Sequence, residues 1–260
     1  RGLGDVYKRQ VITGMYDAAY FLQFATGGAK RLSYAASFGK TNFDAATTRV
    51  YQQMLASYDK ITVREDSAVQ MLESWGAKNC YGQVLDPTLL LSADEWIDLL
   101  VYEEMQIKYA SQKYILVYQI HNDRQLSSYA LRLAAHTGLK LLRVNPFMHQ
   151  VHRGGKFVLC PDVTEFLSLI KNATYIVTDS FHGTCFSLTF EKQFIEVLPN
   201  NTTGTRNQSI LALTGLSNRI VYDFDDFSII NRMINYQPVR EILAKERGRS
   251  VKMLKCLLNS

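Results

Sequence analysis

Cysteine is scarce in this chain of 260 residues, and its four cysteines lie far apart in the sequence. Cys80, Cys160, Cys185 and Cys256 offer neither the close pairs of a zinc site nor a CxxC redox motif. We therefore expect reduced thiols of the kind that proteins keep in the cytoplasm.

Long apolar runs and basic runs are also missing. No stretch stays apolar over the length that a membrane-spanning helix requires, and we find no signal peptide. The formal net charge is +5, from 29 basic and 24 acidic residues, which suits anionic ligands or surfaces without requiring nucleic acid. Because no nucleic-acid-binding signature is present, we expect no nucleic-acid partner. The isolated cysteines lead us to expect a cytoplasmic location.

The first ten residues, RGLGDVYKRQ, show no hydrophobic period and begin with Arg1 instead of Met. We expect residues 1–10 to be foreign to the protein, as a translated adapter or cloning scar would be, and the chain to be a fragment. A genuine internal segment is the alternative.

Strand-like and helix-like segments alternate along the rest of the chain, of which 47% is hydrophobic and 20% charged. The predicted strands are 30–36, 60–63, 82–86, 113–120, 140–144, 174–178, 194–197 and 219–223. The predicted helices are 43–57, 65–76, 94–100, 126–137, 161–173, 182–190, 207–214 and 238–259. Residues 145–160 are predicted to form a loop.

Alternating βαβ units imply parallel sheets with right-handed crossovers, and therefore an α/β fold. The charged stretch 101–112 lacks a strong period and is predicted to be a linker between two Rossmann-like domains. We place the remainder of the N-terminal domain at 11–110 and the C-terminal domain at 111–236. Residues 237–260 should form a helix that braces the first domain; attachment of this basic helix to anionic lipid is the alternative.

The segment TYIVTDSFHGTCFSLTF, residues 174–190, passes from a buried strand into a helix. Ligands of open α/β sheets bind at such strand ends, and the first turn of a helix favours an anion. His182 can act there as acid or base, Asp179 can orient its imidazole or cap the helix, and Gly183 lets the backbone approach a ligand. Backbone N–H groups from Ser180 to Thr184 should hold phosphate. The alternative is a capped helix with a packed histidine.

Five segments occur in the order and rough spacing found in polysaccharide pyruvyl transferases, a family that the chain resembles over residues 11–222. These segments are KRLSYAASFG, VREDSAVQMLESWG, VLDPTLLL, TDSFHGTCFSLTF and RNQSILALTGLSNR. The resemblance implies two Rossmann-like domains in a GT-B-like arrangement. It also implies that the first part of the N-terminal domain, with an acidic motif, is missing.

The same resemblance implies transfer of a pyruvyl group from phosphoenolpyruvate to two sugar hydroxyls, giving a cyclic ketal and phosphate. His182 matches the family's histidine, and Arg64 matches an arginine that follows the strand 60–63. Arg206 is a second candidate, because an arginine fork binds carboxylate or phosphate bidentately. Ser37, at the end of the first strand, should face the cleft between the domains. Arg64 could instead be a surface arginine paired with Glu65 or Asp66. Arg206 could be a solvated loop charge, and Ser37 could serve packing alone.

His149 and His152 could suggest a metal pair, but no carboxylate or cysteine accompanies them at a suitable spacing. We predict no metal and no cofactor besides phosphoenolpyruvate as co-substrate, and we expect this loop to contact acceptor sugar or phosphate.

The expected acceptor is a sugar or lipid-linked oligosaccharide of a cell-surface polysaccharide, met in the cytoplasm or at the inner face of the membrane. Two rival functions remain at this point. One is a GT-B glycosyltransferase that uses a nucleotide sugar, and the other is a catalytically silent relative that binds sugar or phosphate. The oligomeric state is not predicted.

Overall fold

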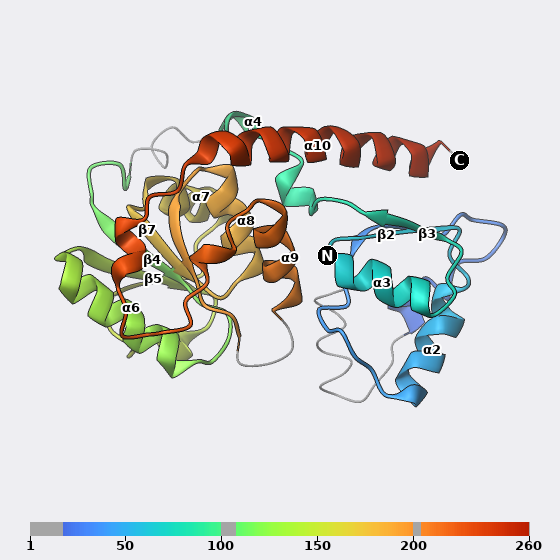
Figure 1. The fold of residues 1–260 in the computed structure, drawn as a ribbon, viewed down its shortest axis with the longest axis horizontal. Coiled ribbons are helices and arrows are strands. Elements are labelled where there is room, and N and C mark those ends of the chain that lie inside the picture. Colours follow the sequence, from blue (N-terminus) through green and yellow to red (C-terminus); the bar gives the residue numbers. More distant parts are fainter. Residues whose placement is uncertain (1–17, 100–107, 200–203, 260) are drawn as a thin grey trace. The chain divides into compact units, whose positions relative to one another are not determined.

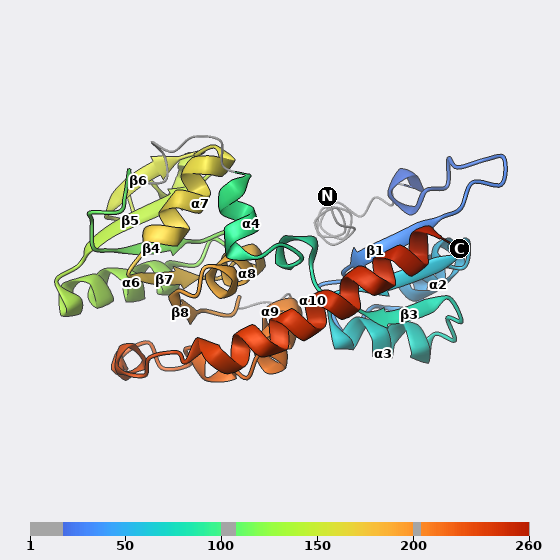
Figure 2. The same ribbon diagram turned by 90° about the horizontal axis from the view of Figure 1, so that it is seen from above.

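The computed structural model describes residues 18–99, 108–199 and 204–259, which form two compact units. We call these the N-terminal unit (18–90, 204–213 and 242–259) and the C-terminal unit (described residues of 91–199 and 214–241). Each unit has its own parallel sheet (Figures 1 and 2). Residues 1–10 lie outside the described part, so their foreign origin stays a prediction.

A three-stranded parallel sheet in the order β1-β2-β3 forms the centre of the N-terminal unit. Its strands are β1 (Leu32–Ala36), β2 (Lys60–Val63) and β3 (Cys80–Gln83). Helices α2 (Ala45–Leu55) and α3 (Asp66–Ser74) connect them. Two right-handed crossovers in the same direction place both helices on one face of the sheet. The apolar residues buried there include Tyr51, Leu55, Ile61, Val63, Met71 and Leu72.

The long terminal helix α10 (Tyr236–Leu258) belongs to the N-terminal unit over most of its length. The Ser250 hydroxyl accepts a hydrogen bond from the backbone N–H of Leu85 at 2.9 Å, and Arg247 donates to the carbonyl of Leu89. These contacts hold the helix on the sheet face opposite α2 and α3 (Figure 1). The packing is what a bracing helix requires.

A five-stranded parallel sheet in the order β6-β5-β4-β7-β8 forms the centre of the C-terminal unit. Its strands are β4 (Tyr114–Tyr118), β5 (Lys140–Asn145), β6 (Lys156–Leu159), β7 (Tyr175–Thr178) and β8 (Gln193–Glu196). The chain builds the sheet outward from β4 to β6 and then returns to the other side of β4 for β7. This is the strand order of a doubly wound Rossmann sheet, which reverses direction between β4 and β7.

Helices cover both faces of this sheet (Figure 1). Helix α6 (Arg124–Thr137) packs on one face through Leu126, Tyr129 and Leu133. Right-handed connections place α7 (Val163–Asn172) and α8 (Phe181–Thr189) on the other face. Between these layers β4 is buried on both sides, as its continuous apolar sequence predicts.

The remaining helical segments are short. They are η1 (Ala18–Phe21), η2 (Pro87–Leu89), α4 (Ala93–Asp98), η3 (Met148–Gln150), α9 (Thr205–Leu213), η4 (Ser217–Arg219) and η5 (Ser228–Asn231).

Two segments differ from the prediction. Residues 145–160, predicted to be a loop, contain the edge strand β6, whose four residues are too few and too exposed to show a strand pattern. Residues 219–223, predicted to be a strand, form only one bridge, between Ile220 and Glu196. The 3-10 turn η4 occupies the start of that segment, so a continuous ladder cannot form.

The boundary between the units also lies earlier than residue 110, where we expected it. Helix α4 belongs to the C-terminal unit, because Trp96 packs edge-on against Phe186 of α8 with ring centroids 5.3 Å apart. Helix α9 belongs to the N-terminal unit, where the Ser209 hydroxyl accepts a hydrogen bond from Gln83 at 3.0 Å.

Candidate functional site

The carboxyl ends of β4 and β7 mark the point where the strand order of the C-terminal sheet reverses. Loops diverge at such a point, and ligands of doubly wound sheets bind there. Every residue of the segment 179–184 lies at this edge, between β7 and the first turn of α8.

Ser180 is the N-cap of α8, because its hydroxyl accepts a hydrogen bond from the N–H of Gly183 at 3.3 Å. The N–H of Ser180 donates to the Thr178 hydroxyl, and the N–H of Thr184 donates to the Ser180 carbonyl. Three of the five backbone N–H groups that we expected to hold phosphate therefore have partners inside this unit. The helix dipole still favours an anion at this end.

Gly183 allows a close approach between α8 and the sheet. A Cβ atom at this position would lie 2.4 Å from the Thr178 hydroxyl oxygen and 3.0 Å from the Tyr118 ring. The sequence suggested that this glycine makes room for a ligand, whereas the structure shows that it makes room for strand ends.

Thr184 is fully buried, and its hydroxyl contacts the carboxylate of Glu196 at the end of β8 as well as the carbonyl of Ser180. The side chain thus ties α8 to the neighbouring strand. Its position supports the helix start and does not present the hydroxyl to solvent.

Asp179 binds the loop that follows β4. Its carboxylate accepts hydrogen bonds from the N–H groups of Ile120 at 2.7 Å and His121 at 2.9 Å. A third contact, of 3.2 Å, joins it to Nδ1 of the His121 ring. We expected Asp179 to orient the imidazole of His182 or to cap the helix; Ser180 is the cap, and the imidazole that Asp179 contacts here is that of His121.

His121 is therefore a site residue that the sequence reasoning missed. It follows β4 by three positions, with no motif around it, and only the pairing of β4 with β7 brings it to Asp179. A signal was available in retrospect: a histidine just beyond a buried apolar strand of a predicted parallel sheet.

His182 lies in the first turn of α8 and is partly exposed. Its ring contacts the neighbouring ring of Phe181 edge-on, with centroids 5.6 Å apart. Strand β7 and the Ser180 cap fix the backbone that carries it, so the imidazole has a defined position at the edge of the sheet.

A second polar cluster occupies the carboxyl edge of the N-terminal sheet. Arg64, directly after β2, lies 2.9 Å from the carboxylate of Asp86, and both side chains are almost fully buried. Its Nε also donates to the carbonyl of Ala35, a residue of β1 whose φ of 53° is unusual for a residue with a Cβ. The arginine is thus neither a surface side chain nor a partner of Asp66.

Glu65 is the second buried acid of this cluster. One of its carboxylate oxygens accepts hydrogen bonds from the Ser37 hydroxyl and from the N–H groups of Phe38 and Gly39. The other oxygen is buried without a hydrogen-bond partner among the described residues. Burial raises the pKa of Glu65, although these donors and the nearby arginines oppose the rise.

Arg206, in the first turn of α9, is buried and close enough to Glu65 to act on its charge. The structure therefore brings Arg64, Arg206 and Ser37 together around two acids. Sequence reasoning found the two arginines and the serine, but it did not name Glu65 or Asp86 as site residues. His182, Asp179, Ser180, Gly183 and Thr184 form the separate cluster of the C-terminal unit.

The loop 145–160 carries His149 and His152, which the sequence raised as a metal pair. Within the described part of the chain, no three histidine, cysteine or acidic side chains lie close enough together to hold an ion. His152 is exposed, and the backbone of His149 lies in η3. Gln150 is buried and donates to the carbonyl of Gln119 at the end of β4, which anchors this loop to the sheet.

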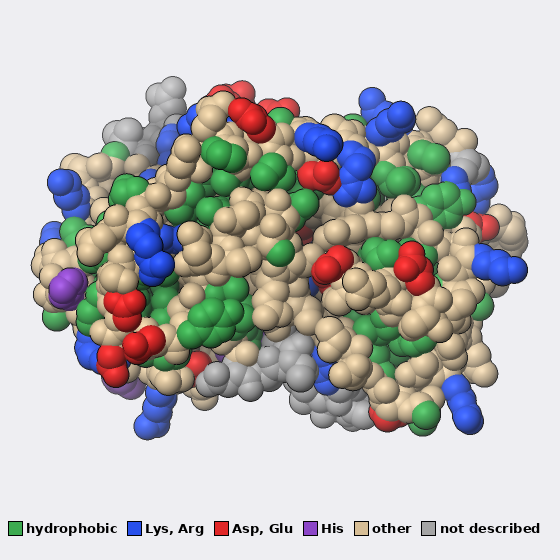
Figure 3. Space-filling view, viewed as in Figure 1, with side chains coloured by type: hydrophobic (Ala, Val, Ile, Leu, Met, Phe, Trp, Pro, Cys, Tyr) green, Lys and Arg blue, Asp and Glu red, His purple; other side chains and the backbone are tan. Residues whose placement is uncertain are grey.

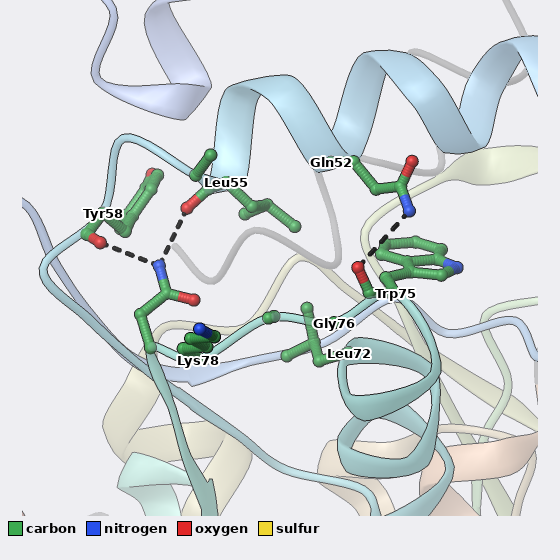
Figure 4. Close-up of a pocket in the computed structure, with 10 residues that line it drawn as sticks. Gln52, Leu55, Tyr58, Leu72, Trp75, Gly76 and Lys78 are labelled. Carbon is green, nitrogen blue, oxygen red and sulfur yellow. Dashed lines mark hydrogen bonds between the residues drawn. The ribbon is translucent and has the colours of Figure 1, made fainter.

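A pocket of about 340 Å³ lies at the other edge of the N-terminal sheet, away from Arg64 (Figure 4). Trp75, Leu72 and Tyr58 line it, where α2 and α3 end. Asn79 donates to the carbonyls of Leu55 and Tyr58 and so holds one wall. None of the predicted site residues lines this pocket.

Helix α10 carries charges of both signs (Figure 3). Arg249 pairs with Glu246 and Arg240 pairs with Glu191, whereas Lys245, Lys252 and Lys255 are exposed. Among the described residues, no helix has the length and hydropathy that crossing a membrane would take.

A family model for polysaccharide pyruvyl transferase matches residues 4–202. The matched range includes every predicted site residue except Arg206, and it begins within the segment that we expected to be foreign. A search of curated proteins found no match.

Solved structures resemble the chain at low identity. UDP-GlcNAc 2-epimerase from Neisseria meningitidis, bound to UDP-GlcNAc, has a TM-score of 0.58 and 12% identity over 94% of this chain and 72% of that one. A UDP-forming α,α-trehalose-phosphate synthase from Burkholderia vietnamiensis has a TM-score of 0.53 and 9% identity over 96% and 77%. MnaA of S. aureus, solved with UDP, has a TM-score of 0.52 and 16% identity over 83% and 60%.

The chain thus spans 60% of the length of MnaA. Identities this low show the fold alone. These neighbours are GT-B proteins, so the predicted α/β class with Rossmann-like sheets and a GT-B-like fold is confirmed.

Proposed function

The chain belongs to the polysaccharide pyruvyl transferase family, and we propose that it transfers the pyruvyl group of phosphoenolpyruvate to two hydroxyls of one sugar. The products are a cyclic ketal and phosphate. The observation that carries this proposal is the position of His182, in the first turn of α8 where the strand order reverses, inside the sequence matched by the family model. An imidazole at this place can exchange protons with a bound anion.

His182 would deliver a proton to C3 of phosphoenolpyruvate, which makes C2 electrophilic toward a sugar hydroxyl. The α8 dipole would favour the negatively charged substrate at the same end of the helix. Asp179 would act through the loop that it binds, and Ser180, Gly183 and Thr184 would hold the helix start in place.

Arg64 and Arg206 would be anion ligands of the N-terminal unit, because a guanidinium fork binds a carboxylate or a phosphate group bidentately. The two arginines differ in the contacts that they make in the structure. Arg64 is paired with Asp86 and Ala35 and so holds strand ends together, whereas Arg206 lies near the buried Glu65. Ser37 would act indirectly, because its hydroxyl donates to Glu65.

The acceptor would be a sugar of a cell-surface polysaccharide precursor, free or lipid-linked, and the reaction would need no cofactor. A lipid-linked acceptor would bring the enzyme to the inner face of the membrane, where the exposed lysines of α10 could meet anionic lipid. No observation favours a nucleotide-sugar donor, since the likeness to UDP-sugar enzymes extends only to the fold.

The test is incubation of the protein with phosphoenolpyruvate and candidate glycans, following phosphate release and product mass. His182→Ala should lower ketal formation by about 10²–10⁴-fold with an unchanged melting temperature, as loss of a general acid does. His136→Ala, at an exposed position in the last turn of α6, is the matched control and should keep most of the activity. Undiminished turnover in His182→Ala would remove the histidine from its role.

A further inference from the structure

His121 is held by Asp179 in the manner of an oriented base. The carboxylate accepts two backbone N–H groups from residues 120 and 121 and contacts Nδ1 of the ring at 3.2 Å. The Asp179 side chain is 2% exposed, so these bonds lie away from solvent, whereas the His121 side chain is 23% exposed. The ring therefore has one anchored nitrogen and a face that reaches the surface of the edge.

The loop that carries His121 is fixed from its other side as well. Gln119, fully buried at the end of β4, donates to the carbonyl of Asp123. Arg153 donates to the same carbonyl at 3.0 Å and also binds the side chain of Asn122. A side chain supported in this way keeps one position, which is what a catalytic group needs.

The hydrogen bonding also assigns the ring nitrogens. An ionised Asp179 can only accept, so Nδ1 of His121 carries the hydrogen and Nε2 is left as the basic nitrogen. A carboxylate behind one nitrogen of an imidazole makes the other a better proton acceptor. Asp179 is the charged group that contacts this ring. Arg153 binds the backbone of Asp123 in the same loop, and His182 lies in the first turn of α8.

We propose that His121, oriented by Asp179, is a second catalytic residue and takes the proton from the sugar hydroxyl that attacks first. This role rests on the proposed function. The hydroxyl oxygen bonds to C2 of phosphoenolpyruvate while its proton passes to Nε2 of His121, and His182 gives a proton to C3. The C2–O bond to phosphate then breaks, and the phosphate leaves with the electron pair and the proton from His121. The second hydroxyl bonds to C2, and its proton restores His182.

Two imidazoles account for all the proton transfers of ketal formation, which a single imidazole cannot do. Ketal formation removes a proton from each of two hydroxyls, adds one to C3 and adds one to phosphate. One histidine that began as the acid cannot also accept the first hydroxyl proton in the same step. The reversal point of the sheet supplies a second one, from a different loop, with its own carboxylate.

The experiment compares His121→Gln and His121→Ala with His136→Ala in the full chain. His136 is an exposed histidine at the far end of α6, so it lies at the opposite edge of the same sheet. The substrates are phosphoenolpyruvate, methyl glycosides that offer two hydroxyls close enough to form a cyclic ketal, and the same sugars linked to a polyprenyl diphosphate. The readouts are kcat, the Kd of phosphoenolpyruvate, the pH profile and rescue by added imidazole.

Both His121 variants should lower kcat about 100-fold or more and leave the Kd of phosphoenolpyruvate within about twofold. The rate of the wild type should fall at low pH, where a general base is protonated, and His121→Gln should lose this acid limb. Imidazole should restore part of the activity of His121→Ala. A merely structural role would lower the melting temperature without altering the pH profile or giving rescue, and would overturn the proposal.

The outcomes also separate this role from the function on which it rests. If the wild type and His136→Ala are active and His121→Gln retains more than a third of the rate, the role of His121 is excluded while the proposed function stands. If the wild type releases no phosphate with any of these acceptors, the proposed function fails, and this role fails with it.

Discussion

The two sheets of this protein end in clusters of opposite character. At the carboxyl edge of the N-terminal sheet, the ions are buried and paired, as Arg64 is with Asp86. At the same edge of the C-terminal sheet, a buried carboxylate, Asp179, supports His121, and both His121 and His182 are partly exposed. The first arrangement stabilises a backbone that includes a strained residue, Ala35. The second leaves two imidazoles partly exposed. Equivalent positions in two parallel sheets can thus differ in how deeply their charged and titratable side chains are buried.

The largest effect should follow from breaking the buried pair of the N-terminal unit. Asp86→Asn keeps the shape of the side chain but removes the charge that faces Arg64 at 2.9 Å. A buried guanidinium without its carboxylate costs about 3–5 kcal/mol. Chemical denaturation should show this loss in the free energy of unfolding. A change below about 1 kcal/mol would mean that the pair is not a stabilising feature.

The carboxyl edge of the C-terminal sheet depends on close packing and not on a buried ion pair. Gly183→Ala tests this dependence. The added methyl group would lie 2.4 Å from the Thr178 hydroxyl oxygen, so α8 must shift. We expect a loss of about 1–3 kcal/mol, as in other overpacked sites, together with lower activity, because His182 moves with the helix. The control is Gly248→Ala in α10, where a Cβ meets nothing within 4 Å. That variant should gain up to about 1 kcal/mol, since alanine is the better helix former.

Glu65→Gln tests whether burial, which raises the pKa of Glu65, outweighs the attraction of the nearby arginines, which lowers it. Because the pKa of Glu65 is raised in the folded protein, the native state binds a proton that the unfolded chain has lost. Its contribution to stability therefore falls as pH rises from the ordinary value of 4.5 through the folded pKa. Glutamine keeps the accepting oxygen for Ser37 and the two backbone N–H groups.

Melting temperatures of the wild type and Glu65→Gln should consequently diverge in favour of the variant between pH 4.5 and neutral pH. Subtracting the two melting temperatures at each pH cancels the titration of the other groups, which both proteins share. The opposite trend, with the wild type gaining on the variant as pH rises, would show that the arginines outweigh burial.

The smallest effect should come from an exposed pair. Glu191→Gln removes the partner of Arg240, whose side chain is 57% exposed. Solvent screens such a pair, and we expect a change of less than about 1 kcal/mol in the free energy of unfolding. Set beside Asp86→Asn, the variant separates the contribution of burial from that of charge pairing. If both variants lost the same free energy of unfolding, burial would make no difference to the contribution of a charge pair.

Local patterns predicted most of the fold and part of the site. Continuous apolar runs such as 113–120 identified buried strands, and the helices predicted at 126–137 and 161–173 are found at Arg124–Thr137 and Val163–Asn172. The arginines and His182 were found because they follow strands and match family segments. Long-range pairing was not visible in the sequence. Residues Asp179 and His121 meet only because β4 and β7 are neighbours, and the strand order that makes them neighbours cannot be derived from local spacing.

The helix that ends the chain has a consequence for the order in which the molecule is made. Ser250 accepts a hydrogen bond from a backbone N–H next to β3, so the N-terminal unit takes part of its structure from residues that are translated after the C-terminal unit. The described C-terminal unit draws only on residues between 91 and 241. The N-terminal sheet therefore receives the helix on one of its faces only after the whole C-terminal unit has been synthesised.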